Sequence, residues 1–224
     1  MHNGFMEDRI VVIGGHGKVA RLLLPLLTGA GHQVTAVIRN PDHATAVGAT
    51  GAIPLVTDVE HLGTGALAGH LAGHDAVIWS AGAGGGDPAR TFAVDRDAAI
   101  RSMEAAAEAG VRRYLMVSYF GAGPDHGVPE DNPFFPYAAA KSAADQHLTG
   151  TALAWTVLGP SRLTDGPATG LIETDTQGAV PGEVPRADVA AVTLAALHDP
   201  STIGRTIRFN TGTTPIAKAL AARP

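Results

Sequence analysis

The sequence contains no cysteine, only a small net charge and no long apolar run. Without cysteine, the 224-residue chain has no disulfide, no thiolate zinc site and no cysteine nucleophile. The net charge of −5, with no block of Lys and Arg, gives no reason to expect a nucleic-acid surface. The ten histidines show no metal-ligand spacing such as His-Glu-x-x-His, so we expect no metal site.

The apolar runs are all shorter than a membrane span, which needs ~20 residues, so we expect no membrane association. The amino-terminal stretch MHNGFMEDR lacks the basic and apolar regions of a secretory signal. These features together predict a cytoplasmic location.

Short apolar runs alternate with longer segments of helical spacing. The expected strands lie at 9–13, 33–38, 53–56, 76–80, 114–118, 155–158 and 206–209, and the expected helices at 18–30, 97–109, 136–148 and 187–198. Near-continuous apolar strands are typical of a sheet covered on both faces. The alternation predicts an α/β fold, a single Rossmann-type doubly wound parallel sheet with helices on both faces. One domain spans 1–224, with a small substrate-side region at about 160–185.

Glycines interrupt the chain where the first strand meets the first helix. They fit two registers of a dinucleotide-binding fingerprint, Gly15-x-Gly17-x-x-Ala20 and Gly14-x-x-Gly17-x-x-Ala20. One glycine permits the tight turn, the next lets the backbone approach the pyrophosphate, and the small third residue lets the helix pack on the strand. The phosphates are then expected at the positive end of the helix. A turn without a ligand is the alternative.

The next two strands end in residues that bear on the choice of cofactor. Arg39 stands where an NAD-preferring site usually has an acidic residue, and a guanidinium can clamp a 2′-phosphate. This favours NADP(H) over NAD(H), unless Arg39 is only a solvated residue at a strand end. Asp58 and Val59 are candidates to flank the adenine, Asp58 through the exocyclic amine and Val59 through its backbone. A helix N-cap would explain Asp58 equally well.

These residues, with motifs further along, resemble the short-chain dehydrogenase/reductase superfamily, and within it the atypical, NmrA-like branch of NAD(P)H-binding proteins that includes biliverdin-IXβ and flavin reductase-like enzymes. The resemblance covers nearly the whole chain and rests on VIGGHGKVA, VIRNPDH, TDV, DAVIWSAGAGG, VDRDAAI, RRYLMVSYFG, PYAAAKSAAD, WTVLGPSRLTD and VPRADVAAVTLAAL. The chain departs from the family where Arg-Pro-Gly-x-Leu is common: it reads Gly-Pro-Ser-Arg-Leu at 159–163 and lacks the usual Arg.

The resemblance implies a set of cofactor-binding and catalytic positions. Tyr137-Ala-Ala-Ala-Lys141 matches the family's Tyr-x-x-x-Lys segment, and Pro160 would face the nicotinamide. The implied cofactor-binding residues are Gly14, Gly15, His16, Gly17, Lys18, Val19, Arg39, Asp58, Val59, Ala81, Gly82, Ser118, Lys141 and Pro160. Within this set, His16 is expected to contribute its backbone rather than its ring.

Tyr137, Lys141 and Ser118 are the catalytic candidates. A Tyr and a Lys four residues apart lie on one helical face. A phenol has a pKa near ~10, and a nearby ammonium and an oxidised nicotinamide would both favour the phenolate, so Tyr137 could exchange a proton with a carbonyl. Ser118 could polarise that carbonyl, and Lys141 could bond the nicotinamide ribose. Ordinary structural roles are the alternatives, and Asp95 and Arg96 are expected to form a structural pair.

Two functions remain open at this point. The first is an NADP(H)-dependent oxidoreductase transferring hydride to a small carbonyl, quinone or flavin-like acceptor, in a pocket lined by 82–90, 119–136 and 163–171. The aromatic residues Phe134, Phe135 and Tyr137 suit a flat or apolar small-molecule substrate, and a place in the core would explain them equally well. The second is a non-catalytic NADP-binding redox sensor of the NmrA-like type. Tyr137 favours the enzyme, and a nucleotide-binding protein that has lost both roles is a third option.

Overall fold

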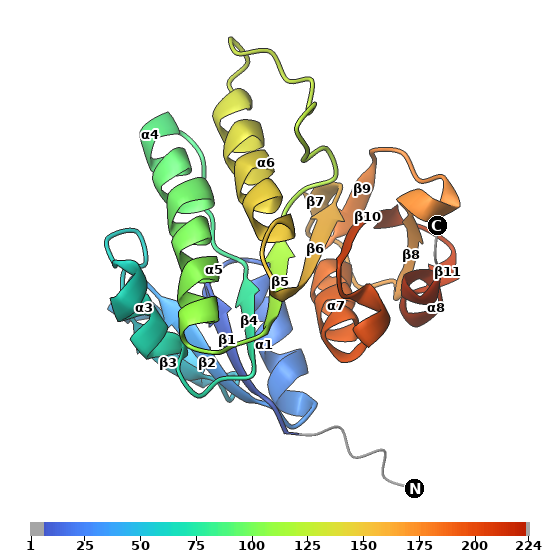
Figure 1. Cartoon of the computed structure of the whole chain (residues 1–224). Coiled ribbons are helices and arrows are strands. Elements are labelled where there is room, and N and C mark those ends of the chain that lie inside the picture. Colours follow the sequence, from blue (N-terminus) through green and yellow to red (C-terminus); the bar gives the residue numbers. More distant parts are fainter. Residues whose placement is uncertain (1–6, 223–224) are drawn as a thin grey trace, which may run out of the picture.

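A computed structural model describes residues 7–222 of the chain (Figure 1). Residues 1–6, on which part of the expectation about a secretory signal rests, lie outside the described residues. Between residues 7 and 222 there is no helix with the length and apolar character needed to cross a membrane.

The described residues form a nine-stranded sheet in the order β11-β8-β10-β6-β5-β4-β1-β2-β3. Adjacent strands from β3 to β10 pair in parallel, and β8 runs antiparallel to both β10 and β11. The reversal of strand order between β1 and β4 is that of a doubly wound Rossmann-type sheet. The strands are β1 (Arg9–Ile13), β2 (Gln33–Ile38), β3 (Ile53–Val56), β4 (Ala76–Trp79), β5 (Arg113–Val117), β6 (Ala154–Pro160), β8 (Leu171–Thr174), β10 (Arg205–Thr211) and β11 (Thr214–Pro215).

Helices cover both faces of the sheet (Figure 1). One face packs against α1 (Ala20–Gly29), α7 (Arg186–His198) and α8 (Ile216–Ala221), and the other against α3 (Thr64–Leu71), α5 (Ala99–Glu108) and α6 (Phe135–Thr149). The shorter elements are α2 (Ala44–Gly48), α4 (Pro88–Thr91), the π-helix η2 (Phe92–Ala98), the 3₁₀ turns η1 (Pro41–His43), η3 (Asp175–Gln177) and η4 (Pro200–Thr202), and the pair β7 (Arg162–Thr164) and β9 (Glu183–Pro185).

Strand β1 shows why its sequence is uninterruptedly apolar. Ile10 and Val12 point into the core beneath α1 and α7, while Val11 and Ile13 point into the core beneath α3 and α5. All four side chains are fully buried, and burying each contributes about 1.5–3 kcal/mol. A polar residue at any of the four positions would therefore face a dry core.

The predicted doubly wound α/β fold is confirmed, and the first three strands have the predicted bounds. Two helix starts are wrong. Residues 18 and 19 form a turn, and α1 begins at Ala20; the segment expected to start at 97 is entered through α4 and η2. The sequence reading also missed the short elements around β7, β8, β9 and β11, because strands of two to four residues carry too few positions for a period to show.

Candidate functional site

The glycine-rich loop leaves β1 at the carboxyl edge of the sheet. The N–H groups of Gly14 and Gly15 both donate to the Val37 carbonyl, at 3.1 and 2.9 Å, which ties the loop to β2. Gly14 has a φ of +90°, and a Cβ there would lie 2.5 Å from the Cα of Ala81. A Cβ on Gly15 would lie 2.7 Å from the Cβ of Ala36. These two glycines are therefore required by close packing within the protein itself.

The same loop presents unused hydrogen-bond donors. Within residues 7–222, the backbone N–H groups of His16, Lys18 and Val19 have no hydrogen-bond acceptor. They precede the first turn of the ten-residue helix α1, whose amino terminus carries the positive end of the helix dipole. Gly17 is exposed at this point, so the loop can approach an anion closely. This arrangement fits a bound pyrophosphate.

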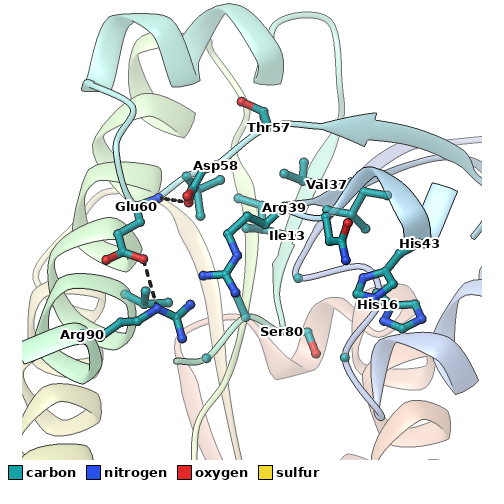
Figure 2. A pocket seen from close by; sticks show the side chains of 18 residues that line it. Ile13, His16, Val37, Arg39, His43, Thr57, Asp58, Glu60, Ser80 and Arg90 are labelled. Carbon is teal, nitrogen blue, oxygen red and sulfur yellow. Dashed lines mark hydrogen bonds and ion pairs between the residues drawn. The ribbon is translucent and has the colours of Figure 1, made fainter. Parts of the chain in front are cut away.

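Beside the loop lies a cavity of about 260 Å³, which we call the loop cavity (Figure 2). Figure 2 shows the Arg39 side chain extending into it, with Asp58 and Glu60 on one side and His16 and His43 on the other. Arg39 is exposed, and its guanidinium has no polar partner among the residues the structure describes. It is therefore available to a ligand. The wall of the loop cavity also includes the predicted residues Gly14, Gly17, Val59, Ala81 and Gly82.

Asp58 does not cap a helix. Its Oδ1 accepts from the Glu60 N–H at 3.1 Å, and its Oδ2 lies 3.2 Å from Nδ1 of His61. Residues 59–61 form a turn, and the next helix begins at Thr64, so the N-cap alternative is wrong. Arg101 donates to the Val59 carbonyl at 3.3 Å. The loop that would flank an adenine is thus held by its own hydrogen bonds.

A second cavity of about 360 Å³, the central cavity, shares Gly17, Ser80, Ala81 and Gly82 with the loop cavity. It also brings together the predicted residues Lys18, Val19, Ser118, Tyr137 and Lys141, whereas the predicted Gly15 lines neither cavity. A third cavity, of about 660 Å³, meets it at Tyr137 and Leu163. The three cavities form one groove along the carboxyl edge of the sheet, where open α/β sheets bind ligands.

Lys141 carries a buried ammonium in the central cavity. Only 1% of the residue is exposed, and across residues 7–222 the only hydrogen bond of Nζ goes to Sδ of Met116, at 3.5 Å. A buried ammonium without an oxygen acceptor is costly, because its lost hydration is not replaced. Lys141 therefore fits an oxygen-bearing ligand in the central cavity, such as a ribose diol.

Two buried carboxyl groups, Asp95 and Asp145, accompany Lys141. Asp95 Oδ2 accepts from the Ala83 N–H at 2.9 Å, and Asp145 Oδ2 accepts from the Ser118 hydroxyl. The Oδ1 atom of each has no partner among the described residues. Burial raises the pKa of Asp95, and it raises the pKa of Asp145 to about 6, in both cases against the opposing effect of Lys141.

These carboxyl groups change the expectation for Tyr137. Burial raises the pKa of its phenol, and the charges of Asp95 and Asp145 raise it further. Burial and these carboxylates therefore disfavour the phenolate that was expected from the sequence. In this structure Tyr137 is a neutral hydroxyl, able to donate a hydrogen bond.

The third cavity is lined by rings, and we call it the aromatic cavity. The rings of Tyr119, Phe134 and Tyr137 contact one another at centroid distances of 5.3 to 5.6 Å. Phe135 instead packs against His126, 5.6 Å away. Pro160 lies in this cavity, at the end of β6, rather than in the central cavity with Lys141. The wall is therefore flat and apolar beside the Tyr137 hydroxyl.

The residues missed by the site prediction include Asp95 and His43, which line the groove, and Asp145, which accepts a hydrogen bond from Ser118 beside it. The expected Asp95–Arg96 pair is wrong, because Arg96 instead pairs with Asp97 at 2.6 Å. Asp145 lies four residues after Lys141 on the same helix, and that spacing was a signal available in the sequence. His43 lies in η1, and no spacing in the sequence relates it to His16.

Comparison with known proteins places the chain among nucleotide-binding proteins. The family model for NAD(P)H-binding proteins matches residues 14–200. A Bacillus subtilis protein named "Uncharacterized sugar epimerase YhfK" is 32% identical over 215 residues, covering 95% of this chain and 98% of its own.

Solved structures give the same result. A Bacillus halodurans protein, described as a candidate NAD-dependent epimerase/dehydratase, has a TM-score of 0.87 at 30% identity, covering 95% of this chain and 98% of its own. The oxidoreductase ylbE from Lactococcus lactis has a TM-score of 0.84 at 30% identity, covering 95% and 94%. The chain belongs to the family of NAD(P)H-binding proteins.

Proposed function

We propose that the protein is a cytoplasmic, NADP(H)-dependent oxidoreductase of the NmrA-like type that reduces a small carbonyl, quinone or flavin-like acceptor. The observation that carries this proposal is the buried Lys141 ammonium, which has no oxygen acceptor among the described residues and lies beside Ser118 and Tyr137. It stands where the groove passes from the loop cavity to the aromatic cavity.

The residues of the groove fit the cofactor along its length. Asp58 and Val59 would flank the adenine, Arg39 would bind the 2′-phosphate, and the N–H groups of Lys18 and Val19 would bind the pyrophosphate. Farther along the groove, Lys141 would bind the ribose next to the nicotinamide. The bound cofactor supplies the hydride.

NADP(H) is favoured over NAD(H) by what faces the loop cavity at the end of β2. The guanidinium of Arg39 is unpaired within the described part of the chain, whereas the carboxylates nearby are already engaged. Glu60 pairs with Arg90 at 3.3 Å, and Asp58 pairs with His61. The 2′-phosphate dianion of NADP(H) would therefore lie beside an unpaired guanidinium, whereas the 2′-hydroxyl of NAD(H) would gain less binding free energy there.

The proton chemistry falls to the hydroxyl groups of Tyr137 and Ser118. Tyr137 joins the central and aromatic cavities, so a flat acceptor lying on the rings of Tyr119 and Phe134 would place its oxygen near the phenol. The neutral phenol would donate a hydrogen bond to that oxygen, and Ser118 would polarise it. A quinone or flavin can instead take its proton from water, in which case the phenol only positions the acceptor.

The test is NADPH oxidation by the purified protein against quinones, flavins and aldehydes, with three variants. Tyr137→Phe should lower turnover of a carbonyl by roughly 10²–10⁴, the worth of general acid catalysis, and leave NADPH affinity unchanged. Lys141→Ala should weaken NADPH binding. Tyr119→Phe is the matched control, because it removes a hydroxyl from the same aromatic cluster.

The outcomes separate the alternatives. Quinone or flavin turnover that survives in Tyr137→Phe identifies a reductase that uses water as its proton source. Tight NADPH binding with no turnover of any acceptor identifies the NADP-binding sensor. Retained NADPH affinity in a folded Lys141→Ala protein, checked by circular dichroism, would overturn the role of Lys141.

A further inference from the structure

His16 and His43 form a stacked pair of imidazoles at the loop cavity. Their ring centroids are 3.5 Å apart and their planes are 15° from parallel. His16 comes from the glycine-rich loop and His43 from η1, so two separate segments contribute one ring each. Both rings line the cavity that Arg39 enters (Figure 2).

The position of His43 is fixed by its own short helix. Asn40 caps η1 by accepting a hydrogen bond from the Asp42 N–H at 3.0 Å, and Pro41 sets the first turn. The His43 N–H donates to the Asn40 carbonyl at 3.2 Å. The ring is therefore placed beside His16 by local structure.

The groups around His16 make its ring hard to protonate in the free protein. Burial, His43 and Arg21 of α1 all lower the pKa of His16. Arg39, at the end of β2, adds a further positive charge to the same cavity. The acidic groups nearby do not offset these charges. Asp58 and Glu60 are paired on the opposite wall, and Asp42, adjacent to His43, is exposed and lies outside the cavity lining.

A phosphate monoester would reverse this balance. Its charge near neutral pH is about −1.5 to −2, and it offers three acceptor oxygens. It would favour the protonated form of an imidazole next to it, since opposite charges raise the pKa of a histidine. Two charged rings in a stack repel, so one proton shared by the pair is the favoured state. The neighbouring neutral ring then faces the cation.

We propose that His16 and His43 form, together with Arg39, a phosphate-monoester site that takes up a proton when the 2′-phosphate of NADP(H) binds. This rests on the proposed NADP(H) preference and extends it: the choice of cofactor becomes dependent on pH. His16 thus contributes its ring as well as its backbone. Arg39 provides a permanent charge, and the histidine pair provides a second one only when the phosphate is present.

The test is isothermal titration calorimetry of NADP⁺ and NAD⁺ at pH 7, in buffers with different ionisation enthalpies. The slope of the observed heat against buffer enthalpy gives the number of protons taken up. NADP⁺ should take up roughly half a proton or more, and its affinity should fall by up to about tenfold per pH unit above pH 7. NAD⁺ binding should show neither effect. Inorganic phosphate is a third titrant, which tests a free anion as the occupant.

Variants assign the proton. His43→Gln and His16→Gln should each lose most of the proton uptake, and NADP⁺ affinity should fall about tenfold or more, the worth of a hydrogen bond to a charged group. Because the nucleotide is the same, its own phosphate titration cancels in the comparison with the unmodified protein. His70→Gln on α3 is the control, since His70 does not line the cavity and its loss should change nothing. An unchanged circular dichroism spectrum and melting temperature show that each variant is folded.

Three results would overturn the inference, and they can be told apart. If NADP⁺ still binds more tightly than NAD⁺ but takes up no proton, Arg39 acts alone and the proposed cofactor preference stands. If NADP⁺ and NAD⁺ bind equally, the proposed preference fails as well. Proton uptake with inorganic phosphate but not with NADP⁺ would assign the pair to a free anion and would also overturn it.

Discussion

The glycines of the loop separate into two kinds, and alanine substitution distinguishes them. Gly14→Ala adds a methyl group at a φ of +90°, which costs about 1–2 kcal/mol in an L-residue. That methyl group would also lie 2.5 Å from the Cα of Ala81, and overpacking of this kind costs roughly a further 1–3 kcal/mol. The free energy of unfolding should therefore fall by about 2–5 kcal/mol in total.

Gly84 isolates the two contributions. Its φ is +84°, yet a Cβ there would meet no atom within 4 Å, so Gly84→Ala carries the backbone cost alone. In a domain of this size 1 kcal/mol shifts the melting temperature by about 2–4 °C. Gly84→Ala should lower it by about 2–8 °C and Gly14→Ala by about 4–20 °C. Equal losses in the two variants would refute the argument that close approach to Ala81 requires the glycine.

We expect Gly17 to serve binding rather than folding. It is exposed, and the nearest atom to its added Cβ is the Gly14 carbonyl oxygen, at 3.2 Å. Gly17→Ala should therefore change stability by less than about 1 kcal/mol and still weaken NADPH binding, because the methyl group occupies the approach to the pyrophosphate. Calorimetry showing unchanged NADPH affinity in the folded variant would contradict a phosphate role for the loop.

Three further predictions follow from charges. Arg39→Ala should weaken NADPH binding by about 1.5–3 kcal/mol and leave NADH binding nearly unchanged. An equal loss of affinity for both cofactors would contradict the assignment of Arg39 to the 2′-phosphate. Burial and His32, 2.7 Å away, lower the pKa of His198, so its contribution to stability should be present above pH ~6.5 and be lost as pH falls through the lowered pKa. Urea unfolding at pH 5–8 should show this, and His198→Gln should flatten it. Since the pKa of Asp145 is raised to about 6, this carboxyl should reduce stability as pH rises from 4 to 7, by up to about 3 kcal/mol. Asp145→Asn should remove that reduction in a matched urea series.

The sheet could be predicted from the sequence because each strand is recognised from the pattern of its own consecutive residues. Strands such as β1 and β2 read as apolar runs bounded by glycine or polar residues, and the same residues that make the run fill both cores. The fingerprint glycines could also be found, since their spacing follows from one turn and one helix start. Short strands near the carboxyl end offered no comparable pattern.

The electrostatics of the site could not be predicted, because they depend on contacts between distant segments. The pKa of Tyr137 was expected to respond to one nearby ammonium. In the structure it also responds to Asp95, which lies in η2 more than forty residues earlier in the chain, and to Asp145, which lies on a later turn of α6. The stacking of His16 on His43 likewise joins the glycine-rich loop to η1. Residue type and spacing give the candidates, whereas tertiary packing decides their protonation.

In the π-helix η2 the number of residues matters as much as their identity. Asp95 reaches Ala83 from this wider helix, while Met103 and Ala106 of the following α5 stay in the core. Removing one codon between Phe92 and Ala98 would favour a regular α-helix and turn everything on one side of the cut by about 100°. Either the carboxylate or the core residues would then lose their partners. Exchange of one residue for another is thus a gentler change here than deletion, whereas the exposed run Gly84–Gly86 tolerates loss of a codon more easily.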